Sequence, residues 1–434
     1  MFFKKTFPGG IHPPTYKNLT QNYPLEEIPS PQKVVLPLIQ HSGSPAEPLV
    51  KPEEVVSMGQ KIASSDKYIS APIHASISGK VSKIDYFNHP ILGKSLAIFI
   101  EDTGVHPDFI PFTKENPENL SPPELKKIIQ EAGIVGLGGA GFPTHVKLSS
   151  PKPIDTLILN AAECEPYLTC DERLLQEKPI EVFKGLEIII KIISPKSVFI
   201  GIEDNKKELI KTIEENLHKL GLNKIKTFIL KTKYPQGGEK QLIKAITGRI
   251  VPSGGLPFDV GTLVHNVGTV FAVYEAVYLG KPLYERIITI SGKAIKKRGN
   301  FKVKMGTLLS DIVEYCGGFI KEPKKIIFGG PMMGIAQWSL DTPIIKGTSG
   351  VLFLTDEELN LENSTACIRC GKCIEVCPMQ IMPASIGLAG EYNKWNIAKE
   401  YSPLDCIECG ACSYICPTRR DLVQFIKLAK QFTR

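Results

Sequence analysis

The chain has 434 residues, of which 42% are hydrophobic and 22% are charged, and its formal net charge is +7. These values are typical of a globular protein that divides into several domains. They argue against a nucleic-acid-binding role, because no basic run is interleaved with aromatic residues, and no apolar run approaches the roughly 20 residues that span a bilayer.

The N-terminal part of the sequence predicts an extended segment followed by a β-domain. Residues 1–33 are rich in proline and are expected to be extended. Residues 34–110 contain short β runs separated by turns, which predicts a small β-domain. These runs lie at residues 34–36, 61–63, 79–84 and 96–100. A proline-bearing linker, residues 111–123, follows.

Residues 120–282 alternate between helical and strand patterns. Ser121 as N-cap, Pro122 and Glu124 form a capping-box pattern that opens a helix, and Gly133 ends it. Strands are predicted at 156–160, 197–202 and 226–231, and helices at 171–190, 205–220 and near 269–279. Asn205 is the expected cap of the second of these helices. This alternation predicts a layered α/β domain.

A smaller α+β unit is expected at residues 283–345. It contains predicted strands at 287–290 and 325–328 and a predicted helix at 307–315, which Gly317 and Gly318 close. Residues 355–430 hold most of the cysteines.

The cysteine pattern is the strongest chemical signal in the sequence. The spacing C-x2-C-x2-C-x3-C-P occurs twice, at Cys367, Cys370, Cys373 and Cys377 and again at Cys406, Cys409, Cys412 and Cys416. Each [4Fe–4S] cubane takes four thiolates, and the cysteine before proline ligates the other cluster of the pair. One cubane is therefore predicted on Cys367, Cys370, Cys373 and Cys416, and the other on Cys406, Cys409, Cys412 and Cys377.

Zinc is the rival interpretation of this pattern. It is disfavoured because the segment contains no histidine and because three evenly spaced cysteines followed by Cys-Pro are not a zinc arrangement. The long insert between the motifs is helix-compatible over residues 383–399, which predicts a helical ferredoxin-like domain. Cys164, Cys170 and Cys316 are interpreted as buried apolar thiols. With no export signal, the 11 cysteines indicate a reducing compartment.

A glycine-rich loop follows the first predicted helix of the α/β domain. Residues 136–142 match GxGxxG, although a helix rather than a strand precedes them. Residues without side chains let backbone N–H groups approach an anion, and Lys147 could neutralise a phosphate. The alternative is a tight loop without a ligand.

Two further loops follow predicted strands, and a third stretch precedes a predicted helix. Residues 160–166 place Glu163 and Glu165 at a strand end, where they could bind ribose hydroxyls or exchange a proton, or simply form a surface turn. Residues 234–240 form a similar loop, with a plain turn as the alternative. In residues 264–269, Thr269 is interpreted as a helix cap and His265 as structural. No hydrolytic Ser/His/Asp or Cys/His arrangement stands out, so no catalytic side chain is assigned.

These loops together resemble the flavin- and NADH-binding subunit of respiratory complex I. The resemblance rests on residues 136–142 with Pro143 and Lys147, and on residues 160–166, 234–239 and 266–269. With Gly-Gly-Ile-His-Pro-Pro at residues 9–14 and the two ferredoxin motifs, essentially the whole chain resembles the RnfC family, the NADH-side subunit of the Rnf membrane complex.

The resemblance implies a multidomain α/β architecture. Residues 34–110 would form a barrel-sandwich hybrid (lipoyl-like) domain, without the lysine that carrier domains present. Residues 120–282 would form a Rossmann-like FMN- and NADH-binding domain, residues 283–345 an SLBB-like β-grasp domain, and residues 355–430 a helical 2[4Fe–4S] ferredoxin-like domain. The implied cofactors are FMN, NAD(H) and two [4Fe–4S] clusters.

The resemblance also implies site residues by position. Those matching flavin positions are Gly136, Gly138, Gly139, Lys147, Asn160, Tyr234, Gly237, Gly238, Asn266 and Thr269. Phe142 and Glu165 match nucleotide-side positions, and Gly141, Glu163 and Glu239 complete the implied lining. The chain departs from the complex I pattern at Ala162, where that relative has aspartate, and at His265 and Gly268.

The function implied is that of a peripheral subunit of a membrane-bound, ion-translocating ferredoxin:NAD oxidoreductase. Its expected partners are the other Rnf subunits, NADH/NAD⁺ and, indirectly, ferredoxin, at the cytoplasmic face of the inner membrane. The net positive charge fits either a solvated lysine-rich surface or attraction to an anionic membrane or acidic redox partner. A related cobalamin reductase and a flavin-free ferredoxin-type docking adaptor are the alternatives. Residues 9–14 and the N-terminal β-domain favour the Rnf interpretation over the reductase.

Overall fold

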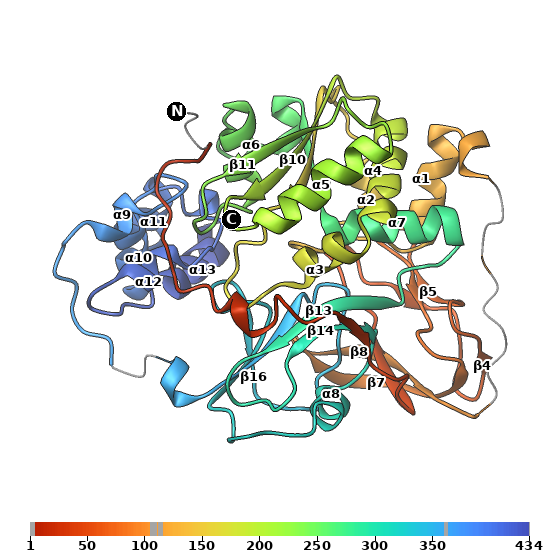
Figure 1. The fold of residues 1–434 in the computed structure, drawn as a ribbon. Helices are drawn as coiled ribbons and strands as arrows, with labels where there is room; N and C mark the ends of the chain where they lie inside the picture. Colours follow the sequence, from red (N-terminus) through yellow and green to blue (C-terminus); the bar gives the residue numbers. More distant parts are fainter. Residues whose placement is uncertain (1–4, 105–110, 112–115, 360–362, 434) are drawn as a thin grey trace.

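The computed structural model describes residues 5–104, 111, 116–359 and 363–433. The end of the predicted β-domain, residues 105–110, and residues 112–115 of the predicted linker lie outside the described residues. Figure 1 shows an α/β layer above two β regions, with a helical C-terminal region at one side. None of the described helices has both the length and the apolarity required to cross a membrane.

The N-terminal β region is a barrel sandwich of two sheets, as predicted. One sheet has the order β2 (Lys33–Pro37), β8 (Gly93–Glu101), β7 (Gly79–His89) and β4 (Val55–Val56). The other contains β3 (Glu47–Pro48), β5 (Lys61–Ser64) and β6 (Ile73–His74). Leu36, Ile62, Ile73 and Ile98 are fully buried between the sheets, so the apolar alternation of the β runs accounts for the core.

The α/β layer is built on a parallel sheet of order β11-β10-β9-β12. The strands are β9 (Thr156–Ala161), β10 (Ser197–Glu203), β11 (Lys226–Leu230) and β12 (Thr262–Asn266). One face is covered by α4 (Pro179–Ile193), α5 (Lys207–Lys219) and α7 (Val267–Leu279), and the other by α6 (Glu239–Thr247). Leu157 and Leu159 pack toward the first face and Ile158 toward the second, as strand alternation requires.

Two short helices and the predicted capping-box helix also belong to this layer. α1 (Pro122–Glu131) begins at Ser121, whose backbone N–H donates to Glu124 Oε2 at 2.7 Å, so the predicted capping box is confirmed. α2 (Thr144–Lys147) follows the glycine loop, and α3 (Cys170–Glu177) follows β9.

Three helix predictions are corrected. The helix expected at 171–190 is two helices, α3 and α4, because Pro179 cannot continue the preceding one. The helix expected at 205–220 starts only at Lys207 and is not capped by Asn205, since Lys206 N–H donates to Glu203 O at 3.1 Å and closes a turn there. Thr269 is not the cap of α7, because Asn266 has that role.

The second β region is a six-stranded sheet of order β1-β14-β13-β17-β15-β16. Its strands are β13 (Glu285–Ser291), β14 (Gly299–Lys304), β15 (Lys325–Phe328), β16 (Ile335–Gln337) and β17 (Gly350–Leu354), with α8 (Leu309–Tyr315) packed on it. Strand β1 (Leu25–Glu27) comes from the N-terminal segment and pairs in parallel with β14. The sheet therefore includes residues on both sides of the 283–345 range.

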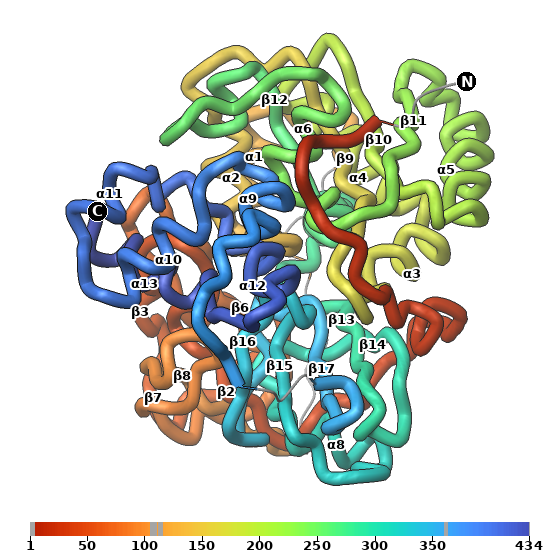
Figure 2. The backbone as a smooth tube through the Cα atoms, turned by 90° about the vertical axis from the view of Figure 1, so that its left-hand side faces the viewer, coloured from red at the N-terminus to blue at the C-terminus, as the bar shows by residue number. Residues whose placement is uncertain are grey.

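The N-terminal segment ties the regions together. From residue 5 onward it runs between the α/β layer and the C-terminal helices before reaching the second β region (Figure 2). Gly10 N–H donates to Val376 O and Ile11 N–H to Tyr234 O, both at 2.8 Å. Gly9 has a φ of +75°, and a Cβ there would lie 2.8 Å from Cys377 O, so this crossing requires glycine.

The C-terminal region is helical, as the insert predicted. It contains α9 (Lys372–Glu375), α10 (Pro383–Glu391), α11 (Trp395–Glu400), α12 (Ala411–Ile415) and α13 (Leu422–Thr433). The stretch 383–399 is thus two helices rather than one. Ile386, Leu422 and Ile426 form their common core. Single 3₁₀ turns occur at Lys17–Leu19, Pro117–Asn119, Pro257–Val260, Asp356–Glu358 and Pro403–Asp405.

Candidate functional site

The carboxyl ends of the parallel strands bring the predicted loops together. Asn160 at the end of β9 and Asn266 at the end of β12 are register partners. Asn160 Nδ2 donates to Gly237 O at 2.9 Å, which draws the 234–240 loop to the same edge. Ligands of open α/β sheets bind at this edge, because helix N-termini and loops surround it. Residues far apart in the sequence therefore form one candidate site.

The glycine loop has donors available for an anion. Gly136 N–H donates to Phe142 O at 2.8 Å and closes the loop. Gly138, Gly139 and Ala140 are exposed, and no acceptor among the described residues takes a hydrogen bond from their backbone N–H groups. Consecutive unpaired N–H groups on one loop form a nest that suits a phosphate or another anion. The loop thus fits the predicted phosphate-binding role.

The shape of this loop depends on glycine at one position more than at its neighbour. A Cβ on Gly138 would lie 2.7 Å from Asn266 Nδ2, whereas a Cβ on Gly139 would meet nothing within 4 Å. Asn266 is itself fixed, since its Oδ1 accepts from Gly268 N–H at 2.9 Å and its Nδ2 donates to Asp171 at 2.5 Å. The open side at Gly139 leaves room for a ligand.

Lys147 and Glu239 meet in the structure. Lys147 Nζ lies 2.6 Å from Glu239 Oε1 and 2.6 Å from Val264 O. The positive charge expected to neutralise a phosphate is therefore partly compensated within the protein. His265, on β12, is buried, and burial lowers its pKa well below the ordinary value, which fits the structural role expected for it.

The two glutamates after β9 bind backbone N–H groups. Glu163 Oε1 accepts from Asp171 N–H at 3.0 Å, at the start of α3. Glu165 accepts from Met332 N–H at 3.2 Å and Met333 N–H at 3.0 Å, and burial raises the pKa of Glu165 to about 7. Tyr234 Oη donates to Glu165 Oε1 at 3.3 Å. Glu165 therefore joins the α/β layer to the second β region rather than standing free.

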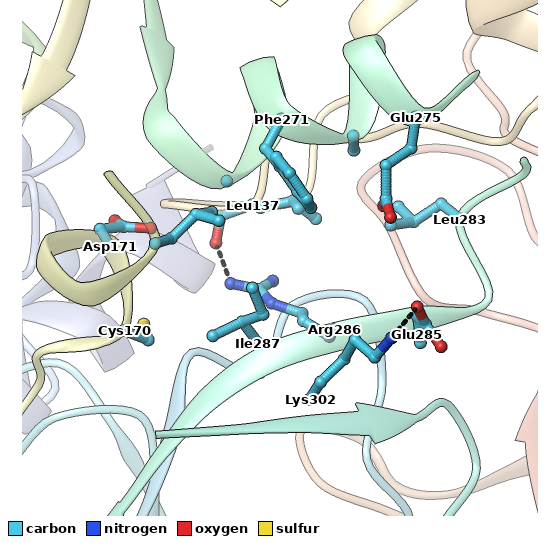
Figure 3. A pocket seen from close by; sticks show the side chains of 13 residues that line it. Leu137, Cys170, Asp171, Phe271, Glu275, Leu283, Glu285, Arg286, Ile287 and Lys302 are labelled. Carbon is cyan, nitrogen blue, oxygen red and sulfur yellow. Dashed lines mark hydrogen bonds and ion pairs between the residues drawn. The ribbon is translucent and has the colours of Figure 1, made fainter. Parts of the chain in front are cut away.

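A small cavity of about 30 Å³ lies beneath the glycine loop, between α3, α7 and β13 (Figure 3). A cavity of this size can hold a water molecule. Its wall includes Leu137, Asp171 and Arg286, and Arg286 Nη2 donates to Leu137 O at 2.8 Å. Burial raises the pKa of Asp171 to about 7. Neither Asp171 nor Arg286 was identified from the sequence as part of the site.

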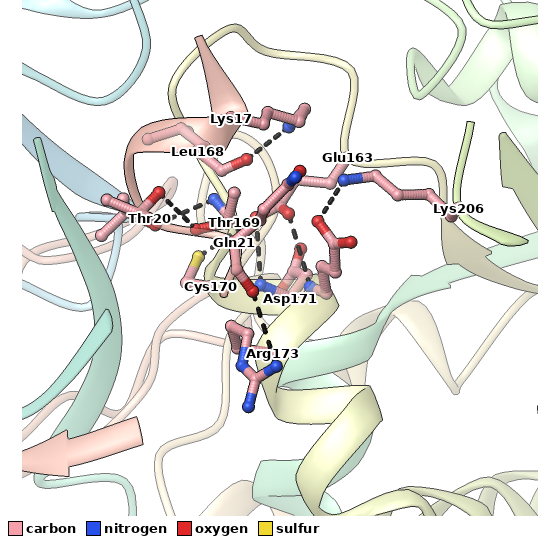
Figure 4. Close-up of polar contacts among 12 residues, drawn as sticks. Lys17, Thr20, Gln21, Glu163, Leu168, Thr169, Cys170, Asp171, Arg173 and Lys206 are labelled. Atoms are coloured by element: carbon pink, nitrogen blue, oxygen red, sulfur yellow. Dashed lines mark hydrogen bonds and ion pairs between the residues drawn. The ribbon is translucent and has the colours of Figure 1, made fainter. Parts of the chain in front are cut away.

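Lys17 and Lys206, from distant segments of the chain, lie near the carboxylates that follow β9 (Figure 4). Lys17 Nζ donates to Leu168 O and, at 3.1 Å, to Glu165 O. Lys206 Nζ forms an ion pair with Glu172. The N-terminal segment thus supplies a cation to the site, a contribution that requires the tertiary fold and carries no local sequence signal.

Glu203, at the end of β10, should make the stability of the folded protein depend on pH. It is buried, and burial raises its pKa to about 7 from the ordinary 4.5. Because the folded chain then holds a proton that the unfolded chain releases, this group lowers stability as pH rises from about 4.5 to 7. Glu203→Gln should remove on the order of 2 kcal/mol of that decline. Urea unfolding followed by circular dichroism across this pH range measures it.

Glu214→Gln, on the exposed face of α5, is the matched control and should leave the pH profile unchanged. An unchanged profile in Glu203→Gln would show that Glu203 does not titrate in this range.

The first cysteine motif encloses a cavity with one cysteine of the second. The cavity has a volume of about 160 Å³ and is lined by Cys367, Cys370 and Cys373 together with Cys416. Its other walls are mostly apolar and include Ile368, Ala384 and Leu422. These four thiols are the set predicted for one cubane. The space that they enclose fits a cluster held by three cysteines of one motif and the fourth of the other.

The second motif gathers with Cys377 in the same crossed arrangement. Cys377, Cys409 and Cys412 are buried and Cys406 is half-buried. The pKa of the Cys412 thiol is raised to about 12, first by burial and then by the neighbouring Cys406, Cys409 and Cys377. These are the four cysteines predicted for the other cubane.

The two motifs adopt the same local backbone conformation. Arg369 N–H donates to Cys367 Sγ at 3.4 Å, and Glu408 N–H donates to Cys406 Sγ at 3.3 Å. Arg369 and Glu408 also share a left-handed conformation, with φ of 56° and 58°. Backbone N–H···S bonds of this kind stabilise thiolates that bind metal.

The two cysteine sites differ in their surroundings. Cys409 packs in one apolar cluster with Ile11 and Tyr234, and a Cβ on Gly410 would lie 2.8 Å from Met332 O. Cys367 and Cys370 are exposed. The site of Cys406, Cys409, Cys412 and Cys377 therefore lies against the α/β layer, and the other site faces outward. Of the remaining cysteines, Cys170 and Cys316 are buried thiols, as expected, and Cys164 is half-buried.

Four family models match successive parts of the chain. The RnfC barrel sandwich hybrid domain matches residues 5–105, and the Nuo51 FMN-binding domain matches residues 129–275. The SLBB domain matches residues 287–336, and a 4Fe-4S dicluster domain matches residues 359–417. The order of the predicted domains is therefore confirmed.

Curated relatives match over nearly the whole chain. A subunit of the proton-translocating ferredoxin:NAD(+) oxidoreductase complex of Clostridium ljungdahlii is 50% identical, covering 99% of this chain and 94% of that protein. A subunit of the Na(+)-translocating ferredoxin:NAD(+) oxidoreductase complex of Acetobacterium woodii is 43% identical, covering 98% of this chain and 96% of that protein. A subunit of the ion-translocating oxidoreductase complex of Rhodobacter capsulatus is 41% identical, covering 86% and 73%.

Among solved structures, the chain is similar to an NAD+-reducing [NiFe]-hydrogenase in the H2-reduced state. The TM-score is 0.53 at 18% identity, and the match covers 74% of this chain and 64% of that chain. At this identity the similarity concerns the fold alone.

Proposed function

Because the chain belongs to the RnfC family, whose members are subunits of ion-translocating ferredoxin:NAD(+) oxidoreductase complexes, we propose that it is the subunit that binds FMN and NAD(H) and relays electrons through two [4Fe–4S] clusters. Its partners are then the other subunits of the complex, with ferredoxin as an indirect one. FMN bound in this chain would supply hydride exchange with NAD(H) and single-electron exchange with the clusters.

Tyr234 links the candidate flavin site to a cysteine site, and this contact is the main support for the proposal. Tyr234 belongs to the loop drawn toward Asn160, and its ring packs with Cys409. The same tyrosine donates to Glu165 at 3.3 Å. Electron exchange between two centres requires them to lie close together, and these contacts support sites that lie side by side.

We assign the ligand contacts as follows. The exposed N–H groups of the glycine loop hold the FMN phosphate, and the neighbouring strand-end residues hold the rest of the flavin and the nucleotide. The assigned residues are Gly136, Gly138, Gly139, Gly141, Phe142, Lys147, Asn160, Glu163, Glu165, Tyr234, Gly237, Gly238, Glu239, Asn266 and Thr269. The eight cysteines of the two motifs hold the clusters in the crossed arrangement.

The surroundings of the two cysteine sites indicate which site exchanges electrons with the flavin and which with a partner subunit. The site that contains Cys409 is packed against the α/β layer, so it exchanges electrons with the flavin. The site that contains Cys367 and Cys370 is exposed, so it exchanges electrons with a partner subunit. We also propose a peripheral position for the chain, at the cytoplasmic face of the inner membrane. Protease digestion of right-side-out and inverted vesicles tests this, since only inverted vesicles should expose it.

Composition and activity of anaerobically purified protein test the proposed function. We expect iron and sulfide for two [4Fe–4S] clusters, bound FMN and NADH:ferricyanide activity. Clusters without flavin binding or NADH oxidation would leave only the docking adaptor. NADH-dependent reduction of a cobalamin at a rate above that of ferricyanide would instead favour the cobalamin reductase.

A further inference from the structure

A buried arginine from the SLBB region reaches into the glycine loop. Arg286 lies on β13, is 6% exposed, and donates from Nη2 to Leu137 O at 2.8 Å and from Nη1 to Lys346 O. Figure 3 shows its guanidinium directly beneath Leu137. Within the described part of the chain, nothing accepts a hydrogen bond from its Nε, which also faces this packed interior.

The positive charge of Arg286 lies in the protein interior. A buried cation is costly unless hydrogen bonds or a counter-charge compensate it. The nearest acidic group on α3, Asp171, already accepts from Asn266 Nδ2 at 2.5 Å. Arg286 is instead hydrogen-bonded to two backbone carbonyls, one from the glycine loop and one from residue 346. Its direct polar contacts are therefore with the backbone, at the junction of two domains.

The contact with Leu137 fixes the orientation of one peptide group. Leu137 N–H donates to Thr269 Oγ1 at 2.9 Å, and Leu137 C=O accepts from Arg286, so both polar groups of this residue are held inside the protein. In a trans peptide the carbonyl and the following N–H point in opposite directions. Holding the Leu137 carbonyl inward therefore turns the N–H of Gly138 outward, toward the exposed side of the loop.

We propose that Arg286 is a positioning residue for the flavin site: from the SLBB domain it holds the peptide between Leu137 and Gly138 so that the Gly138 N–H faces the FMN. This inference rests on the proposed function of the loop. It also assigns the SLBB domain a role in flavin binding, since the residue that orients the loop comes from a different domain than the loop itself.

The test uses the full-length protein with its clusters loaded and measures FMN affinity by quenching of flavin fluorescence. Arg286→Met should weaken FMN binding about tenfold or more, because hydrogen bonds from charged donors are among the stronger ones. Arg286→Lys should recover part of the affinity, since an ammonium can still donate to Leu137 O but lacks the fork that holds both carbonyls. Urea unfolding of the flavin-free forms is measured in parallel.

Lys304→Met is the matched control. Lys304 is a buried cation on the neighbouring strand β14 that pairs with Glu285 at 2.6 Å and does not reach the glycine loop. It should leave FMN affinity at the wild-type value, whatever its effect on unfolding.

Wild-type FMN affinity in both Arg286→Met and Arg286→Lys would overturn the proposal. So would equal losses of affinity in Arg286→Met and Lys304→Met, because the effect would then reflect domain stability alone. If Arg286→Met does not fold, weakened FMN binding by Arg286→Lys with an unchanged unfolding midpoint supports the proposal, and unchanged binding overturns it. Failure of the wild-type protein to bind FMN would instead count against the proposed function.

Discussion

Replacement of Cys377 by alanine should remove the cluster of the second motif and leave the cluster of its own motif intact. Burial and, after it, the neighbouring thiols of Cys406, Cys409 and Cys377 raise the pKa of Cys412, whereas the cavity of the first motif is lined by Cys416. A cubane that loses one of four thiolates is not retained at full occupancy. We therefore expect about half of the iron and sulfide to be lost.

Spectra of matched variants decide which cluster remains. Cys409→Ala removes a ligand of the same predicted cluster, and Cys370→Ala removes a ligand of the other. The EPR spectrum of reduced Cys377→Ala protein should match that of Cys409→Ala and differ from that of Cys370→Ala. A match with Cys370→Ala would mean that each motif holds its own cluster without crossing. Electron exchange between flavin and clusters should also cease in Cys377→Ala, because the missing cluster is the one packed against the α/β layer.

Replacement of Gly138 by alanine should abolish most FMN binding. The added Cβ would lie 2.7 Å from Asn266 Nδ2 and 2.8 Å from its Cγ, and the Asn266 side chain cannot yield without releasing its hydrogen bonds to α7 and Asp171. Loss of an asparagine cap costs about 1 kcal/mol, and the displaced loop would no longer aim its N–H groups at a phosphate. We expect FMN affinity to fall about tenfold or more in fluorescence titrations.

The Gly139→Ala variant distinguishes steric strain within the loop from a direct clash between the added Cβ and the ligand. A Cβ at Gly139 meets nothing within 4 Å, so the flavin-free Gly139→Ala protein should unfold at the wild-type urea concentration, whereas Gly138→Ala should unfold earlier. Both variants should weaken FMN binding if the ligand covers the open side of the loop. Equal stability of the two flavin-free variants would contradict the steric argument, and wild-type FMN affinity in both would remove the loop from the site.

The local chemistry of this chain could be predicted from its sequence. The cysteine motifs and the capping box of α1 place their interacting groups within a few residues, so spacing alone encodes them. The strands β9, β10 and β11 of the α/β layer follow from apolar runs bounded by turns, whereas the fourth strand, β12, is not among the predicted ones. The break at Pro179 could also be predicted, because proline cannot continue the helix that precedes it.

Contacts between domains could not be predicted in this way. Arg286 and Leu137 are 149 positions apart in the sequence. Ser42 is 98 positions from Ala140, to whose carbonyl oxygen its hydroxyl donates. Neither contact has a local signature, because each depends on how separate domains pack around the loop. The same holds for Glu163 and Glu165: their position at a strand end could be predicted, but the backbone N–H groups from α3 and from the loop before β16 that donate to their oxygens could not.

Reoxidation of the clusters by NAD⁺ tests most directly whether electrons pass between NAD(H) and the clusters through FMN. The protein, with clusters reduced by dithionite and excess reductant removed, is mixed with NAD⁺ in two forms, loaded with FMN and flavin-free. The cluster EPR signals should disappear and NADH should form only in the FMN-loaded protein. Reoxidation at the same rate without FMN, or clusters that stay reduced when FMN is bound, would contradict this expectation.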